Sequence, residues 1–240
     1  AKLRRDFRDQ KRGGAPVWRE RPPVEASAVP QGLVRLYGLH TVRAALDNPT
    51  RKIRRMLVTR NALERLETSD SGALAFLVEI VVPKAIDKEA GSDAVHQGVL
   101  IVAEPLLSRP LAGLADTKLV LVLDQVTDPH NVGAIMRSCV AFNAGALITT
   151  HRHSPQESGV LAKAASGALE LIPHMEVRNL AECLDELKTL GFQTIGLDSE
   201  GGSPLETSFS GQKSALVLGA EGKGLRQKSR ETVTTLARID

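Results

Sequence analysis

Three segments in the second half of the sequence combine polar residues with glycine, as ligand-binding loops often do. They are Asp124–Gly133, Leu197–Gly202 and Gly219–Gly224, and each lies at the end of an apolar stretch that predicts a strand. In an open parallel sheet, ligands bind beyond the carboxyl ends of the strands. We therefore expect the three segments to meet at one edge of such a sheet and to contribute to one site.

Asn131, Arg137 and Glu221 are the side chains in or near these segments that could take part in chemistry. Arg137 falls outside the apolar stripe of its predicted helix, so its guanidinium is available for a phosphate or a carboxylate, although a surface ion pair is the commoner role. Asn131 also suits the N-cap of that helix. Glu221 lies among glycines that cannot shield a charge, and it is either solvated or paired with a cation such as Arg137.

Several common catalytic and binding motifs are missing from the sequence. Gly219–Gly224 lacks the spacing of a phosphate-binding loop, and no G-x-G-x-x-G fingerprint or G-x-S-x-G hydrolase motif occurs. His151 and His153 lie two residues apart without a carboxylate cluster, so we predict no metal site. Cys139 and Cys183 are too few for a Cys-rich zinc site or a disulfide framework, and we expect both to be buried thiols.

Residues 118–240 alternate strands with helices, which predicts a parallel sheet covered on both faces. The predicted strands are continuous apolar runs at Leu119–Leu123, Ala146–Thr150, Leu169–His174, Gln193–Leu197 and Ala215–Gly219. The predicted helices are Asn131–Asn143, Glu157–Ala168 and Leu180–Leu190.

Residues 32–104 predict a smaller α/β domain in front of this sheet. Its expected strands are Leu36–Gly38, Ile53–Val58 and Gly98–Ala103, its expected helices are His40–Leu46 and Ala62–Leu66, and Ala73–Val82 is predicted as a helix followed by a strand. Residues 105–117 carry two prolines and a glycine and predict a linker. Residues 1–31 have few apolar side chains and many arginines, which predicts a flexible basic arm.

Positive charge is concentrated in the first quarter of the chain. Residues 1–60 hold fifteen Lys or Arg against five Asp or Glu, whereas the rest holds sixteen against twenty-three, which together give the net charge of +3. This asymmetry indicates a surface that binds a polyanion such as RNA, the alternative being a solvated tail. Aromatic residues are only 3% of the chain, so phosphate contacts rather than base stacking are the expected source of affinity.

The order of the motifs resembles that of a known family. N-x-G-x-x-x-R at Asn131–Arg137 and L-V-L-G-x-E-G-x-G at Leu216–Gly224 resemble the SpoU (TrmH) branch of the SPOUT RNA methyltransferases. Y-G-x-H-x-V-x-x-A-L at Tyr37–Leu46 and H-Q-G at His96–Gly98 are similar to the small RNA-binding domain that precedes the catalytic domain in RlmB-like members.

The resemblance implies an enzyme that methylates the 2′-hydroxyl of a guanosine in large-subunit (23S-type) ribosomal RNA, with S-adenosylmethionine as methyl donor. It also implies an α/β-knot (SPOUT) domain with a deep trefoil knot, and a homodimer with the active site near the subunit boundary. By motif position, Asn131, Arg137 and Glu221 match the catalytic residues of the family. Arg137 would then activate the hydroxyl, and the other two side chains would hold the guanidinium and the ribose.

Leu197, Gly219 and Ile239 fall where the family holds the adenosyl group of the donor. The third motif of the family, a Pro- and Gly-containing loop followed by S-L-N-V-S and a last helix, would begin just after Ile239, whereas the sequence ends at Asp240. We expect the natural protein to continue there with a Ser/Asn pair, a further donor contact and the segment that completes the knot.

Two alternatives stay open on the sequence alone. One is a transfer-RNA ribose methyltransferase, and the other is a non-catalytic RNA-binding or ribosome-assembly factor with the same fold. The longest apolar stretches are far shorter than a membrane span, and the charged first residues do not resemble an export signal. We therefore expect a cytoplasmic protein without a membrane partner.

Overall fold

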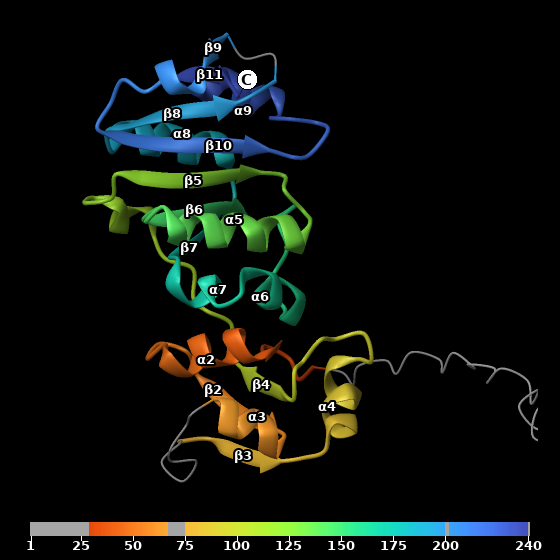
Figure 1. Ribbon diagram of the computed structural model, residues 1–240. Helices are drawn as coiled ribbons and strands as arrows, with labels where there is room; N and C mark the ends of the chain where they lie inside the picture. The colour runs from red at the N-terminus through yellow and green to blue at the C-terminus, as the bar shows by residue number, and fades with distance from the viewer. Residues whose placement is uncertain (1–28, 67–74, 200–201, 240) are drawn as a thin grey trace, which may run out of the picture.

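The structure, a computed structural model, describes residues 29–66, 75–199 and 202–239. Figure 1 shows two sheets, one formed within residues 34–103 and the other within residues 119–238. Most of the predicted basic arm, residues 1–28, lies outside the described residues. The same is true of residues 73–74, with which the predicted helix–strand segment Ala73–Val82 begins.

The first sheet has four strands in the order β1-β4-β2-β3. Antiparallel ladders join β4 to β1 and to β2, and a parallel ladder joins β2 to β3. All five residues of β4 are buried, as its place between two neighbours requires. The strands are β1 (Val34–Tyr37), β2 (Ile53–Val58), β3 (Leu77–Ile80) and β4 (Val99–Ala103), and the helices are α2 (Leu39–Asp47), α3 (Arg60–Arg65) and α4 (Pro83–Ala90).

The second sheet has seven strands in the order β7-β6-β5-β10-β8-β11-β9, and every ladder in it is parallel. The strands are β5 (Leu119–Asp124), β6 (Ala146–Thr150), β7 (His174–Val177), β8 (Phe192–Leu197), β9 (Ser203–Pro204), β10 (Lys213–Gly219) and β11 (Thr235–Arg238). The helices are α5 (Pro129–Ala141), α6 (Gly159–Ala165), α7 (Ala168–Leu171), α8 (Leu180–Thr189) and α9 (Gln227–Thr232), with 3₁₀ turns at Leu111–Leu114 and Leu205–Thr207. The predicted parallel α/β sheet is confirmed.

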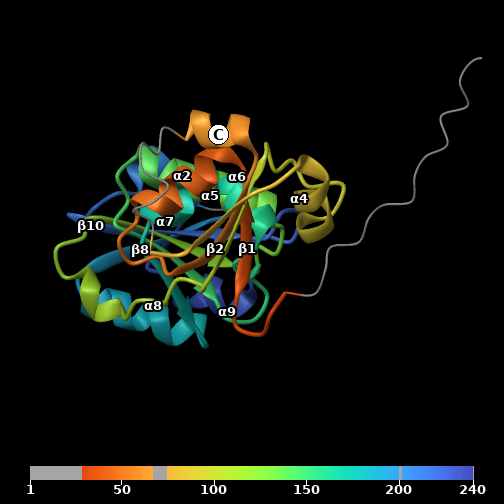
Figure 2. The ribbon, with the colours of Figure 1, turned by 90° about the horizontal axis from the view of Figure 1, so that it is seen from below.

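Helices cover both faces of the second sheet, as Figure 2 shows with α5 and α6 on one side and α8 and α9 on the other. On the first face Met136 of α5 belongs to one apolar cluster with Leu147. On the opposite face Leu184 of α8 belongs to another cluster with Ile148. Neighbouring residues of one strand therefore serve opposite faces, which is the alternation that a sheet between two helical layers requires.

The segment from 157 to 174 differs from its prediction. The predicted helix Glu157–Ala168 is interrupted, because Ser166 and Gly167 adopt left-handed backbone with φ of 49° and 94°. The predicted strand Leu169–His174 is wrong, since α7 covers its first half and β7 begins only at its last residue. A short apolar run is compatible with a helix or a strand, and periodicity alone does not decide between them. The elements α4, β9 and β11 lie where the sequence patterns predict none.

Cys139 and Cys183 are buried, as predicted. Burial raises the pKa of Cys139 to about 11 and that of Cys183 to about 12, so both thiols stay protonated at neutral pH. Over the described ranges, no helix is long and apolar enough to cross a bilayer.

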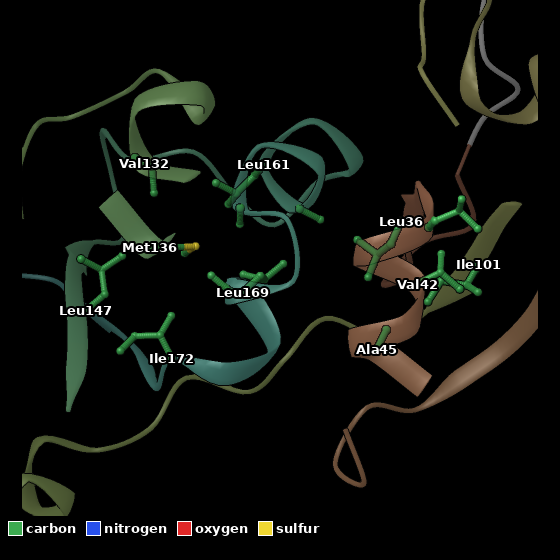
Figure 3. Packing of buried hydrophobic residues seen from close by; sticks show 14 of the residues in the cluster. Leu36, Val42, Ala45, Ile101, Val132, Met136, Leu147, Leu161, Leu169 and Ile172 are labelled. Carbon is green, nitrogen blue, oxygen red and sulfur yellow. The ribbon is translucent and has the colours of Figure 1, made fainter. Parts of the chain in front are cut away.

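One apolar cluster extends across both sheets. Leu36 and Ile101 of the first sheet, Val42 of α2, and Leu161 and Leu169 of α6 and α7 all belong to it. Figure 3 shows the two groups of side chains facing each other, with α6 and α7 on one side and α2 on the other. The two sheets are therefore packed against each other through helices, in addition to being joined along the chain.

Candidate active site

The carboxyl ends of four neighbouring strands of the second sheet form one edge. In Figure 1 the arrows of β5, β8 and β10 end on the same side. Leu197 is the last residue of β8, Gly219 is the last residue of β10, and Ile239 directly follows β11. The order β5-β10-β8-β11 therefore brings all three predicted donor-binding residues to this edge.

Helix α5 starts beside this edge and carries the motif Asn131–Arg137. Its N-cap is Asp128, whose carboxylate accepts a hydrogen bond of 2.8 Å from the amide of His130. The interpretation of Asn131 as the N-cap is therefore wrong, because the cap lies three residues earlier and Pro129 occupies the first turn. The amide group of Asn131 is left available for a contact outside its own helix.

Asn131 and Glu221 are in contact at the strand ends. The Nδ2 of Asn131 donates to the Oε2 of Glu221 over 3.3 Å, although the two residues are 90 positions apart in the chain. Glu221 is exposed and Asn131 is half-buried. The two sequence motifs, one after β5 and one after β10, therefore meet through their polar side chains.

The loop that carries Glu221 folds back tightly on the end of β10. The amide of Ala220 donates to the carbonyl of Gly224 over 3.1 Å, and the amide of Gly224 donates to the carbonyl of Ala220 over 2.8 Å. A Cβ at Gly219 would lie 2.1 Å from the carbonyl carbon of Gly224, so only glycine fits at the end of the strand. This close backbone approach holds Glu221 at the tip of the loop.

Arg137 lies on the exposed side of α5 and contacts the neighbouring helix α6. Its Nη1 donates to the carbonyl oxygen of Ala164. Gly133, one helical turn before Arg137, explains the proximity, because a Cβ at Gly133 would lie 2.6 Å from the Cβ of Ala164. In the described part of the chain, no hydrogen bond or ion pair joins Arg137 to Glu221, so the pairing suggested for these two residues is not formed here.

Two buried carboxylates at the strand ends have functions that the sequence analysis missed. Asp124, which ends β5 and is fully buried, accepts a bond of 2.6 Å from the Nε of Arg226 and one of 3.0 Å from its amide. Asp198, which follows β8, forms an ion pair of 2.8 Å with Arg230. Both pairs tie α9 and the preceding loop to the sheet. The position of each aspartate at the end of an apolar run was the available signal.

The residues at this edge fit an adenosyl group. Leu197 is half-buried and Ile239 is 67% exposed, so apolar side-chain surface is available for a purine and a ribose. Backbone amides and carbonyls beyond the strand ends can supply the hydrogen bonds. No cluster of three or more potential metal ligands occurs among the residues that the structure describes.

Sequence models of two known families match the chain. One is described as the SpoU rRNA Methylase family and matches residues 118–240, which we call the methylase module. The other is described as RNA 2′-O ribose methyltransferase substrate binding and matches residues 35–108, which we call the substrate-binding module.

Individual relatives and solved structures agree with these matches. The chain is 37% identical over 212 residues to the 23S rRNA (guanosine-2′-O-)-methyltransferase RlmB of Ralstonia nicotianae, with 85% of each chain covered. It is 32% identical over 215 residues to the enzyme of the same name from Pseudomonas putida, with 86% of this chain and 87% of the relative covered. The crystal structure of the SpoU methyltransferase AviRb from Streptomyces viridochromogenes with AdoMet has the same fold, with a TM-score of 0.72 at 21% identity over 87% of this chain and 81% of that one. The chain therefore belongs to the SpoU rRNA methylase family.

Proposed function

We propose that this protein transfers a methyl group from S-adenosylmethionine to the ribose 2′-hydroxyl of a guanosine in 23S-type ribosomal RNA. Membership of the SpoU rRNA methylase family and the names of the relatives support the reaction class and the substrate. The observation that carries the proposal for this chain is the contact between Asn131 and Glu221, which joins the two motifs at the strand ends.

Methyl transfer requires catalytic assistance at the attacking hydroxyl rather than at the methyl donor. When bound, S-adenosylmethionine supplies an activated methyl group. A ribose hydroxyl is a poor nucleophile and must lose its proton, to water or to the adjoining phosphate, as its oxygen attacks the methyl carbon. The protein therefore has to stabilise negative charge on that oxygen and hold it in line with the breaking bond.

Arg137 is the proposed electrostatic activator. A guanidinium keeps its positive charge over the physiological range, so it is a poor general base but a good partner for a developing oxyanion or an adjoining phosphate. It carries five N–H donors, of which the bond to Ala164 uses one. In the proposal Asn131 and Glu221 orient the ribose and the guanidinium during the transfer.

The donor site is proposed at the carboxyl edge, with Leu197, Gly219 and Ile239 around the adenosyl group. The division into an RNA-binding domain at 32–104, a linker and a methyltransferase domain from 118 is part of the same proposal. So are the trefoil knot, the homodimer and the cytoplasmic location, each of which rests on the family resemblance.

The proposal is tested by methyl transfer from labelled S-adenosylmethionine to unmodified ribosomal RNA and transfer RNA, with the full-length protein and Glu221→Ala as control. We expect label on one ribose of ribosomal RNA, located by nuclease mapping, and a rate of labelling lower on the order of a hundredfold with the variant. Label on transfer RNA would favour the transfer-RNA enzyme. No transfer to either RNA, despite measurable donor binding, would contradict the proposed substrate.

A further inference from the structure

A helical layer holds the substrate-binding module against the methylase module. A Cβ at Gly159, the first residue of α6, would lie 2.3 Å from the ring of Tyr37 and 2.8 Å from the carbonyl oxygen of Arg35, so α6 packs closely on β1 at a position where only glycine fits. The hydroxyl of Thr41 in α2 donates to the carbonyl of Ala162 in α6 over 3.1 Å, and both residues are buried. This interface is closely packed and lies within the apolar cluster shared by the two sheets.

Arg51 provides the ionic part of this interface. Its side chain is 0% exposed and lies in the loop between α2 and β2. Its Nη2 lies 2.5 Å from the Oε1 of Glu170 in α7, and its Nη1 lies 2.5 Å from the Oε1 of Glu157, which precedes α6. The same Nη1 donates to the carbonyl of Glu104, at the end of the substrate-binding module, over 2.9 Å. One guanidinium therefore joins the two modules.

The two carboxylates have further partners that fix their positions. Glu170 is 1% exposed and accepts a bond of 2.8 Å from the Nδ2 of Asn48. Glu157 is 12% exposed and accepts one of 2.9 Å from the amide of Leu106. Every member of this cluster is held by at least two bonds, so the cluster has a defined geometry.

A buried ion cluster of this kind contributes geometry more than stability. Moving charged groups from water into the protein interior costs free energy, and their mutual attraction offsets only part of this cost. Apolar residues of similar volume often give the folded protein the same stability as the buried ions. Two carboxylates share one guanidinium here, and burial raises the pKa of Glu157 against the opposing effect of Arg51. The shared apolar cluster already supplies contact between the modules, so the specific contribution of the ions is the relative orientation of the modules.

This interface is one helix away from the proposed catalytic arginine. The carbonyl of Ala164, near the end of α6, accepts the bond from Arg137. The adjacent Lys163 lies 2.6 Å from the side-chain oxygen of Gln97 in the substrate-binding module. Helix α6 therefore contacts the substrate-binding module and Arg137 at the same time.

We infer that Arg51, held by Glu157 and Glu170, is a positioning residue that fixes the substrate-binding module relative to Arg137 and thereby selects which nucleotide of a bound RNA is methylated. RNA held by the substrate-binding module reaches the strand ends at a distance set by this interface. A rigid interface admits one nucleotide to the site, whereas a loose one admits its neighbours as well. The part of the inference that concerns RNA rests on the proposed function.

The first measurement is the distance between the modules, and it needs no activity. In the full-length protein, cysteines replace the exposed Glu64 in α3 and Glu182 in α8, and spin labels on them report the distance distribution. The native thiols are buried and protonated, so they do not compete for label. We expect a narrow distribution in the parent protein and a broader or shifted one in Arg51→Ala and Glu170→Gln.

The matched control is Arg54→Ala, three residues after Arg51. It removes an exposed ion pair, since the side chain of Arg54 is 60% exposed in its pair with Glu104. It should leave the distribution narrow. A second comparison is the replacement of Arg51 by Met together with Glu157→Gln and Glu170→Leu, which keeps the volume, removes all three charges of the cluster and should also broaden or shift the distribution. A distribution with the width and the mean distance of the parent protein in Arg51→Ala or in Glu170→Gln would overturn the inference, because packing alone would then hold the modules.

The second measurement is the map of methylated riboses in ribosomal RNA. In Arg51→Ala, kcat/KM at the principal nucleotide should fall at least about tenfold, as expected for a misplacement of the order of 1 Å, with new label at neighbouring positions. The Kd for S-adenosylmethionine should stay unchanged, since Arg51 is not among the residues of the proposed donor site at the carboxyl edge. An unchanged map, or loss of donor binding with loss of transfer, would overturn the inference. If the parent protein methylates no RNA, the proposed function fails, while the distance measurement still decides whether Arg51 fixes the modules.

Discussion

The side-chain amide of Asn131 donates a hydrogen bond of 3.3 Å to the carboxylate of Glu221, and this contact links the loop after β5 to the loop after β10. Parallel strands β5 and β10 are paired in register up to Asp124 and Gly219, so the two loops leave the sheet side by side. The topology of the sheet, rather than proximity in the chain, creates this pair.

Replacing Glu221 with alanine should lower the rate of methyl transfer on the order of a hundredfold and leave donor binding unchanged, because the orientation of the reacting groups is lost while the strand edge stays intact. Single-turnover transfer and calorimetric titration with S-adenosylmethionine would measure the two effects. Glu182→Ala, an exposed glutamate on α8, is the control and should behave like the parent protein. An active Glu221→Ala enzyme would show that the pair has no part in the reaction.

For Arg137, replacement by alanine should abolish detectable transfer, and replacement by lysine should restore only a small part of it. Lysine keeps the charge but cannot reproduce the planar set of donors. The donor Kd should be the same in both variants, since Arg137 contacts α6 rather than the strand ends. If donor binding and transfer disappear together in Arg137→Lys, the residue is structural.

Gly133→Ala should separate α5 from α6. The added Cβ would lie 2.6 Å from the Cβ of Ala164 and 2.8 Å from its carbonyl carbon, which neither helix backbone can avoid by a rotamer change. We expect the free energy of unfolding to fall by about 1–3 kcal/mol, as for other overpacked positions, and transfer to weaken with it. Gly113→Ala is a suitable control in urea unfolding, because nothing lies within 4 Å of its added Cβ.

A second stability prediction concerns Asp124, which is fully buried and paired with Arg226. Arg226→Ala would leave this carboxylate without its charged partner, although the amide of residue 226 would still donate to it. Because Arg226 itself is 42% exposed, the cost should lie below that of a fully buried pair, at about 2 kcal/mol. Urea unfolding with Lys228→Ala, an exposed residue of α9, as control would measure it. Equal urea midpoints for Arg226→Ala and Lys228→Ala would mean that Arg226 does not stabilise the charge of Asp124.

The pH dependence of stability should report on His174, whose Nε2 lies 2.9 Å from the hydroxyl of Thr149. Burial lowers the pKa of His174 below its usual value of 6.5, and the nearby Glu176 opposes this shift without reversing it. The unfolded chain therefore binds more protons than the folded one just below pH 6.5, and the free energy of unfolding should fall as the pH drops through this range.

Replacing His174 with glutamine keeps a side chain that can bond to Thr149 and removes the titration. Thermal unfolding between pH 7 and pH 5 should be less pH-dependent in this variant than in the parent protein. His40→Gln, which replaces an exposed histidine of α2, is the control. Identical slopes for the parent protein and His174→Gln would show that this histidine binds protons equally in the folded and the unfolded chain.

The parallel sheet and the helix of Arg137 could be predicted from the sequence because both depend on local patterns. Buried strands are continuous apolar runs, and the stripe of Val132, Met136 and Cys139 defines the inner face of α5. The partner of Arg137 could not be predicted, since it is a backbone carbonyl 27 residues away with no side-chain signal. The charge count was also misleading for Arg51, which contributes to the basic first quarter of the sequence but is buried between two glutamates.

The single apolar cluster that extends across the two sheets has a consequence for how this protein loses its structure. Two groups of apolar side chains bury each other in this cluster (Figure 3). One group contains Leu36, Val42 and Ile101, and the other contains Leu161 and Leu169. Neither module could unfold without exposing apolar surface on the module that stays folded. The protein should therefore melt in one cooperative step, and a polypeptide cut between the modules would tend to aggregate rather than yield two independent folding units.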